Sequence, residues 1–76
     1  MEMRELHQKT QAILIHGITL QEVAEETLPV GTLYAECART TDVLGQAWVR
    51  IKVENTPGNA WLYDVLPEAL GYPPEG

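Results

Sequence analysis

Residues 46–54, QAWVRIKVE, alternate in a way that constrains the fold more than any other part of the chain. Small or β-branched apolar residues take every second position, with Arg50 and Lys52 between them. This two-residue period is typical of a strand with one buried face. Residues 60–66, AWLYDVL, form a second apolar run, and the NTPGN between the two runs has strong turn chemistry. The sequence therefore predicts an antiparallel hairpin.

The register of this hairpin follows from its charges. Pairing the two asparagines that flank the turn places Ile51 opposite Tyr63 and Arg50 opposite Asp64, which is a favourable cross-strand pair of opposite charges. A slip by one residue would move Asp64 onto the apolar face, where burial of a carboxylate is costly. We predict the register that pairs Arg50 with Asp64.

The N-terminal part has features of helices. Apolar residues recur at helical spacing in 3–16 without Gly or Pro, and Gly17 is a natural helix stop. Thr19 and Glu22 form a Thr-x-x-Glu capping box at the start of the next apolar stripe. These signals predict two helices, over 3–16 and 19–28.

The predicted fold class is α+β, with two short N-terminal helices packed on a three-stranded antiparallel β-meander in a single domain, 1–76. The helical part covers 3–28, the meander 32–66, and a Pro/Gly-rich tail 67–76. Within the tail, Glu68–Leu70 is expected to form one helical turn that Gly71 ends. The expected core contains Leu6, Ile13, Leu14, Leu20, Val23, Val49, Ile51, Val53 and Trp61.

The charge balance favours some partners over others. The chain has 76 residues, with eleven acidic and five basic side chains and a net charge of −6. DNA binding is usually dominated by Lys and Arg contacts to phosphate, so this balance argues against nucleic acid and for a partner with a basic surface. No apolar run approaches the roughly 20 residues of a membrane span, and the N-terminus lacks a signal-peptide pattern. We therefore expect a cytoplasmic protein without membrane association, and its oligomeric state stays open.

One stretch supports a different function. Residues 22–39, EVAEETLPVGTLYAECAR, place an acidic–apolar–Ala segment before a Pro-x-Gly-Thr turn. This segment resembles the second and third helices of sigma-factor-like helix-turn-helix domains. The resemblance implies a compact helix-turn-helix transcription regulator that binds DNA, with the stretch beginning at Thr32 as the recognition helix.

Candidate catalytic and metal-ligating residues are few. His7 and His16 fall on opposite sides of the predicted helix and have no Cys or acidic partner at ligand spacing. Cys37 has no recognisable activating base nearby in the sequence. The glycines do not form a phosphate-binding loop. We therefore predict no catalytic residues, no metal site, no cofactor and no enzymatic activity.

Two surfaces are candidates for binding a partner. Glu22, Glu25 and Glu26 would lie within about 100° of arc on the second predicted helix. They form either a docking face for a basic surface or an ordinary solvated helix face. Trp48 and Arg50 lie on the sheet face away from the predicted core, and an exposed Trp beside Arg is enriched at interfaces. The alternative is that Trp48 is covered by the C-terminal tail.

These observations favour a small acidic protein-binding module that is not an enzyme, such as an inhibitor or an adaptor, docking on a basic surface of a partner. In size and charge the chain is similar to phage-encoded antagonists, including anti-CRISPR proteins. The alternative is the helix-turn-helix DNA-binding regulator.

Overall fold

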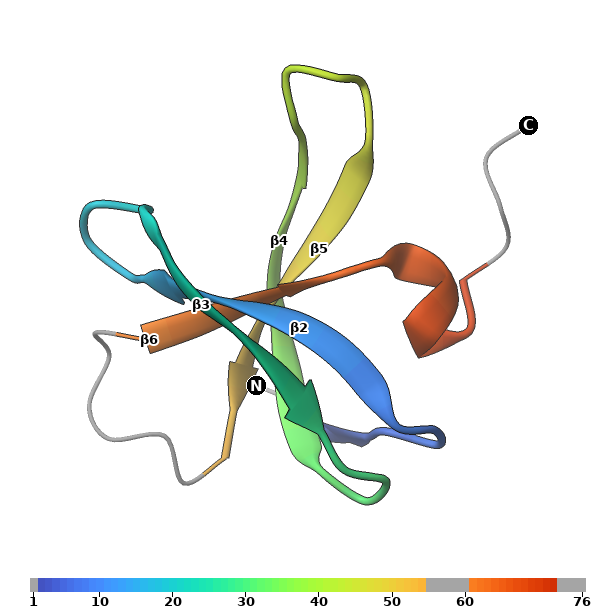
Figure 1. The fold of residues 1–76 in the computed structure, drawn as a ribbon. Helices are drawn as coiled ribbons and strands as arrows, with labels where there is room; N and C mark the ends of the chain where they lie inside the picture. Colours follow the sequence, from blue (N-terminus) through green and yellow to red (C-terminus); the bar gives the residue numbers. More distant parts are fainter. Residues whose placement is uncertain (1, 55–60, 73–76) are drawn as a thin grey trace.

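Six antiparallel strands in one sheet make up most of the computed structural model, which describes residues 2–54 and 61–72 (Figure 1). The strand order is β1-β4-β5-β6-β2-β3, so β1 and β3 are the two edge strands. A single 3-10 turn, η1, follows the last strand. The elements are β1 Arg4–Glu5, β2 Thr10–His16, β3 Glu22–Leu28, β4 Leu33–Thr41, β5 Ala47–Val53, β6 Trp61–Val65 and η1 Pro67–Leu70.

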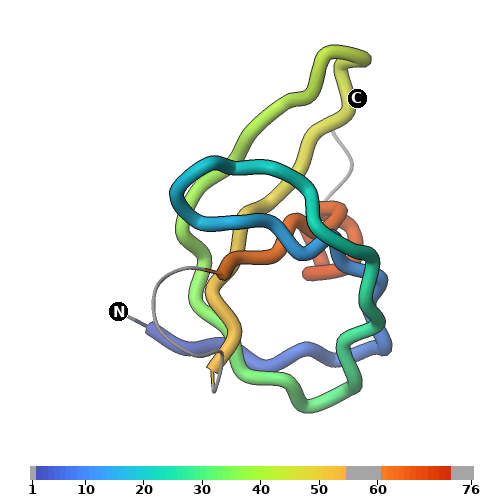
Figure 2. The backbone as a smooth tube through the Cα atoms, turned by 60° about the vertical axis from the view of Figure 1, so that its left-hand side comes forward, coloured from blue at the N-terminus to red at the C-terminus, as the bar shows by residue number. Residues whose placement is uncertain are grey.

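The sheet curls because the chain joins its two edges. β3 at one edge runs directly into β4, which pairs with β1 at the other edge. The Leu6 N–H, just after β1, donates to the Thr32 carbonyl at 2.9 Å, and the Gly31 N–H donates back to the Leu6 carbonyl at 2.8 Å. Figure 2 shows the resulting ring-like path of the backbone. Gly31 has a φ of 90°, which favours glycine in this connection.

The core lies inside this curl. Leu6, Val49, Ile51 and Val65 are almost completely buried. Their cluster also includes Ala12, Leu28, Tyr34 and Tyr63, with Leu14, Val53, Leu70 and Tyr72 packed against it.

The predicted meander is confirmed, and so is its register. β4, β5 and β6 are neighbours in chain order, with Arg50 opposite Asp64 and Ile51 opposite Tyr63. Gly71, at a φ of 84°, ends the turn that was expected over Glu68–Leu70. The predicted turn at 55–59 lies outside the described residues.

The predicted α+β fold class is wrong, because the part of the chain that the structure describes contains no α-helix. Residues 10–16 form β2, and 22–28 form β3, which pairs with it. The helix-turn-helix prediction is wrong for the same reason: Thr32, the expected start of a recognition helix, immediately precedes β4. Helix propensity is weak compared with tertiary pairing, which has overridden it here.

The capping signals at 17–22 belong to a hairpin turn instead. The Thr19 hydroxyl accepts from the N–H of Gln21, and the Leu20 N–H donates to the His16 carbonyl. Leu20 has a φ of 61°, an uncommon left-handed conformation for a side chain of this kind. Leu20 in this turn and Val23 at the start of β3 are about half exposed, at 50% and 53%. Their predicted places in the core are therefore wrong.

The other predicted core residues divide into two groups. Leu6, Val49 and Ile51 are confirmed as buried core, and Leu14 and Val53 pack against it. Ile13 and Trp61 are half-buried and do not belong to this cluster. No helix in the described residues is both long and apolar enough to cross a membrane.

Candidate functional site

The three predicted acidic residues lie on β3, at the edge of the sheet. β3 pairs with β2 on one side, and no strand pairs with its other side among the described residues. Six of its seven residues are exposed, and only Leu28 is buried. An edge strand presents unpaired backbone N–H and C=O groups to its surroundings. Pro29, which has no N–H, directly follows the strand.

A bulge in β3 sets the faces of the carboxylates. Leu14 pairs with Ala24 and Ile15 with Glu22, so Val23 is the extra residue. Since paired residues project to the same face, Glu22 and Glu25 share the face of their partners Ile15 and Ile13. The predicted single helical face for all three glutamates is therefore wrong, although two of them do share a face of the sheet.

Glu26 projects to the opposite face, where it serves the fold. It pairs with Ala12, a core residue, and its Oε2 accepts a hydrogen bond of 2.7 Å from the Tyr63 hydroxyl. Burial of Tyr63, then this hydrogen bond and the nearby negative charge, raise the pKa of Tyr63 to about 12. Glu22 and Glu25 are thus the exposed carboxylates with which a partner can pair most readily.

Arg50 is held by the sheet itself. Its Nε and Nη2 donate to the two carboxylate oxygens of Asp64 at 3.0 and 3.3 Å. Both side chains are largely buried, with 18% and 14% of their surface exposed. Arg50 lies on the same face of the sheet as Glu25, because cross-strand pairs link Arg50 to Asp64, Asp64 to Ile13 and Ile13 to Glu25. Two strands, β6 and β2, separate the two side chains.

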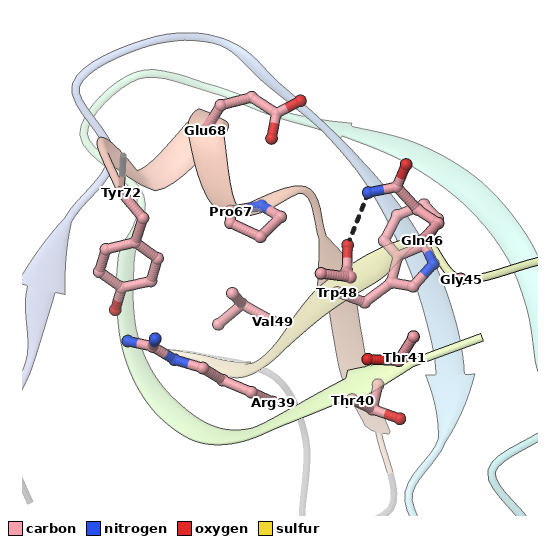
Figure 3. Close-up of a pocket in the computed structure, with 11 residues that line it drawn as sticks. Arg39, Thr40, Thr41, Gly45, Gln46, Trp48, Val49, Pro67, Glu68 and Tyr72 are labelled. Carbon is pink, nitrogen blue, oxygen red and sulfur yellow. Dashed lines mark hydrogen bonds between the residues drawn. The ribbon is translucent and has the colours of Figure 1, made fainter. Parts of the chain in front are cut away.

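Trp48 lies in a different part of the molecule, at a cleft beside the β4–β5 hairpin. The cleft has a volume of about 760 Å³ and is bounded by the hairpin and η1 (Figure 3). Pro67, Glu68 and Tyr72 line it opposite the hairpin. The half-buried Trp48 donates its indole N–H to Oδ2 of Asp42 at 3.0 Å. The structure therefore does not bring Trp48 together with the acidic residues of β3.

The sequence interpretation did not anticipate two features near this cleft. The Arg39 guanidinium lies 4.4 Å from the centre of the Tyr72 ring and also pairs with Glu36. At the tip of the protruding hairpin, Val43 and Leu44 are almost fully exposed (Figure 1). An Asp-x-x-Gly turn was the only local signal for this tip, and contacts such as Arg39–Tyr72 depend on tertiary structure.

The side chain of His16 forms hydrogen bonds within the turn between β2 and β3. The Nδ1 atom of His16 accepts hydrogen bonds from the N–H groups of Ile18 and Thr19 at 3.2 and 3.3 Å, and its ring meets Trp61 edge-on. Within 2–54 and 61–72, no cluster of three or more His, Cys, Asp or Glu side chains could hold a metal ion.

Comparison with known proteins gives no match: no family model, no curated protein and no solved structure resembles the chain.

Proposed function

We propose that this chain is a small non-catalytic protein-binding module that docks on a basic segment of a partner through the acidic edge strand β3. The single observation that carries the proposal is the exposed edge of β3, with Glu22, Glu25 and Glu26 within five consecutive residues. Such a module would act as an inhibitor or an adaptor by occupying the basic segment of its partner.

The electrostatics support a basic partner. The chain carries a net charge of −6, which attracts cations over a distance of about 8 Å at physiological ionic strength. Charge complementarity of this kind speeds association and selects partners. Arg50 supports the fold rather than the docking surface, because its guanidinium is already paired with the carboxylate of Asp64. The sequence argument for DNA binding depended on a helix-turn-helix, which the strands replace.

Neutralising β3 tests the proposal. We expect Glu22→Gln, Glu25→Gln and Glu26→Gln together to weaken binding of a short peptide of alternating Lys and Thr by about tenfold at low salt, mostly through a slower association rate. The fold should survive, since Gln at position 26 can still accept from the Tyr63 hydroxyl. Calorimetric titration over a range of salt concentrations measures the effect, at a dilution at which the variant is monomeric.

The matched control removes the same charge elsewhere. Glu2, Glu54 and Glu68 are exposed and lie outside β3, so their replacement by Gln together should reduce the affinity much less. Equal losses in the two triple variants would show that only net charge matters, and the proposal for β3 would be wrong.

A further inference from the structure

We propose that the basic segment binds in an extended conformation and adds to the sheet as a further strand beside β3. This inference rests on the proposed function, and it concerns how the partner is held. It begins from the backbone: among the described residues, β3 pairs with a strand on one side only, so its outward N–H and C=O groups are available for a second ladder. Strand addition of this kind derives affinity from main-chain hydrogen bonds and specificity from alternate side chains.

The regular part of the edge is long enough for a short peptide. Beyond the bulge at Val23, residues 24–28 pair with β2 without interruption. At about 3.4 Å per residue, this edge offers about 17 Å of regular backbone. Pro29 then ends it. A peptide of alternating side chains would place every second one on the face that holds Glu22 and Glu25, and the others on the opposite face.

The carboxylates determine which strand can pair here. A second copy of the chain would bring six carboxylates together along one short ladder, and like charges on paired strands are destabilising. Charged residues on an edge are a known protection against self-pairing. A strand with Lys or Arg at alternate positions instead meets opposite charge at Glu25 within this ladder and at Glu22 just beyond the bulge. The occupant that the charges favour is therefore a basic segment of another protein.

The other open edge is less suitable. β1 covers only Leu33 and Tyr34 of β4, so the rest of β4 also lacks an outer neighbour among the described residues. That part of β4 contains a bulge at Cys37, which interrupts regular pairing, and it carries Arg39. Arg39 is paired with Glu36 on this part of β4, so a basic segment would meet no net negative charge there. Geometry and charge both select β3.

The experiment separates strand addition from charge attraction alone. Calorimetry first compares two peptides. One is the alternating Lys-Thr peptide, and the other is the same peptide with every second backbone amide N-methylated on the edge that would face β3. Methylation removes ladder hydrogen bonds while every charge remains. We expect the methylated peptide to bind about tenfold more weakly or worse, since several main-chain hydrogen bonds are lost. Methylation of the opposite edge is the matched control, and it should leave the affinity nearly unchanged.

The outcomes are distinct. Weaker binding of only the peptide methylated toward β3 supports strand addition. Equal binding of all three peptides, with the same salt dependence and the same loss in the Glu22, Glu25 and Glu26 triple variant, would overturn strand addition but leave the proposed function standing. If none of the three peptides binds, both strand addition and the proposed function are overturned. A stable dimer of the unmodified chain that requires β3 would identify a second copy as the occupant and overturn the inference.

Discussion

Two side-chain pairs hold strands of the sheet at defined positions relative to one another. Arg50 and Asp64 join β5 to β6 by two hydrogen bonds, and Tyr63 reaches from β6 across β2 to Glu26 on β3. The Arg50–Asp64 pair was predictable, because alternation fixes which face each residue takes and opposite charges favour one register. The Tyr63–Glu26 bond was not predictable, since it depends on β3 being a strand and on its place beside β2.

The raised pKa of Tyr63, caused first by burial and then by the hydrogen bond and charge of Glu26, makes the stability of the fold depend on pH in the alkaline range. The pKa of Tyr63 is raised to about 12 from 10.0. Because the folded state disfavours the phenolate, the stabilisation is fully present below pH 10 and is lost as the pH rises toward 12. We expect the Tyr63 ring carbon signal of the labelled protein to titrate near pH 12 in NMR spectra.

The Glu26→Gln variant separates the causes of this shift. It removes the negative charge but not the burial of Tyr63, which is the largest cause of the shift. The midpoint should therefore fall while staying above 10. Tyr63→Phe identifies the signal. An unchanged midpoint in Glu26→Gln would show that the carboxylate does not act on the phenol.

At the level of elements, strands with simple alternation were predictable and strands without it were not. β5 alternates cleanly, the apolar run 60–66 located β6, and the charge of Asp64 then fixed the register between them. In β2 the run Ile13-Leu14-Ile15 fits both a helical and a strand period, so periodicity could not decide between them. β3 has good helix formers and six exposed residues, and only its pairing with β2 makes it a strand. Its glutamates were identified, but their arrangement was not.

The charge on β3 should also keep the protein from self-pairing. Replacing Glu22, Glu25 and Glu26 by Gln removes the repulsion between two copies of this edge and leaves its backbone groups open. We expect this variant to form dimers or larger species at high concentration, and sedimentation velocity would measure them. The triple Gln variant at Glu2, Glu54 and Glu68 should stay at the same assembly state as the unmodified chain. Similar self-association in both would mean that overall charge, rather than this edge, controls it.

For the whole molecule, contacts distant in sequence decide the fold. The pairing of β1 with β4 and the bonds of Leu6 to the 31–32 segment curl the sheet around a small core. No local pattern in the sequence encodes these contacts, which is why the meander could be predicted but the six-stranded sheet could not. The strand order leaves β3 at an edge of the sheet and thereby turns an acidic stretch into an accessible edge.

The most direct test of this account is an amide NMR titration of the labelled protein with the alternating Lys-Thr peptide. We expect the largest shift changes to fall on residues 22–28 and the outward amides of β3 to become protected from hydrogen exchange. Amides around Trp48 and Tyr72 at the cleft should change little. Changes centred on that cleft, or spread evenly over all exposed carboxylates without new protection in β3, would contradict the claim that β3 is the binding edge.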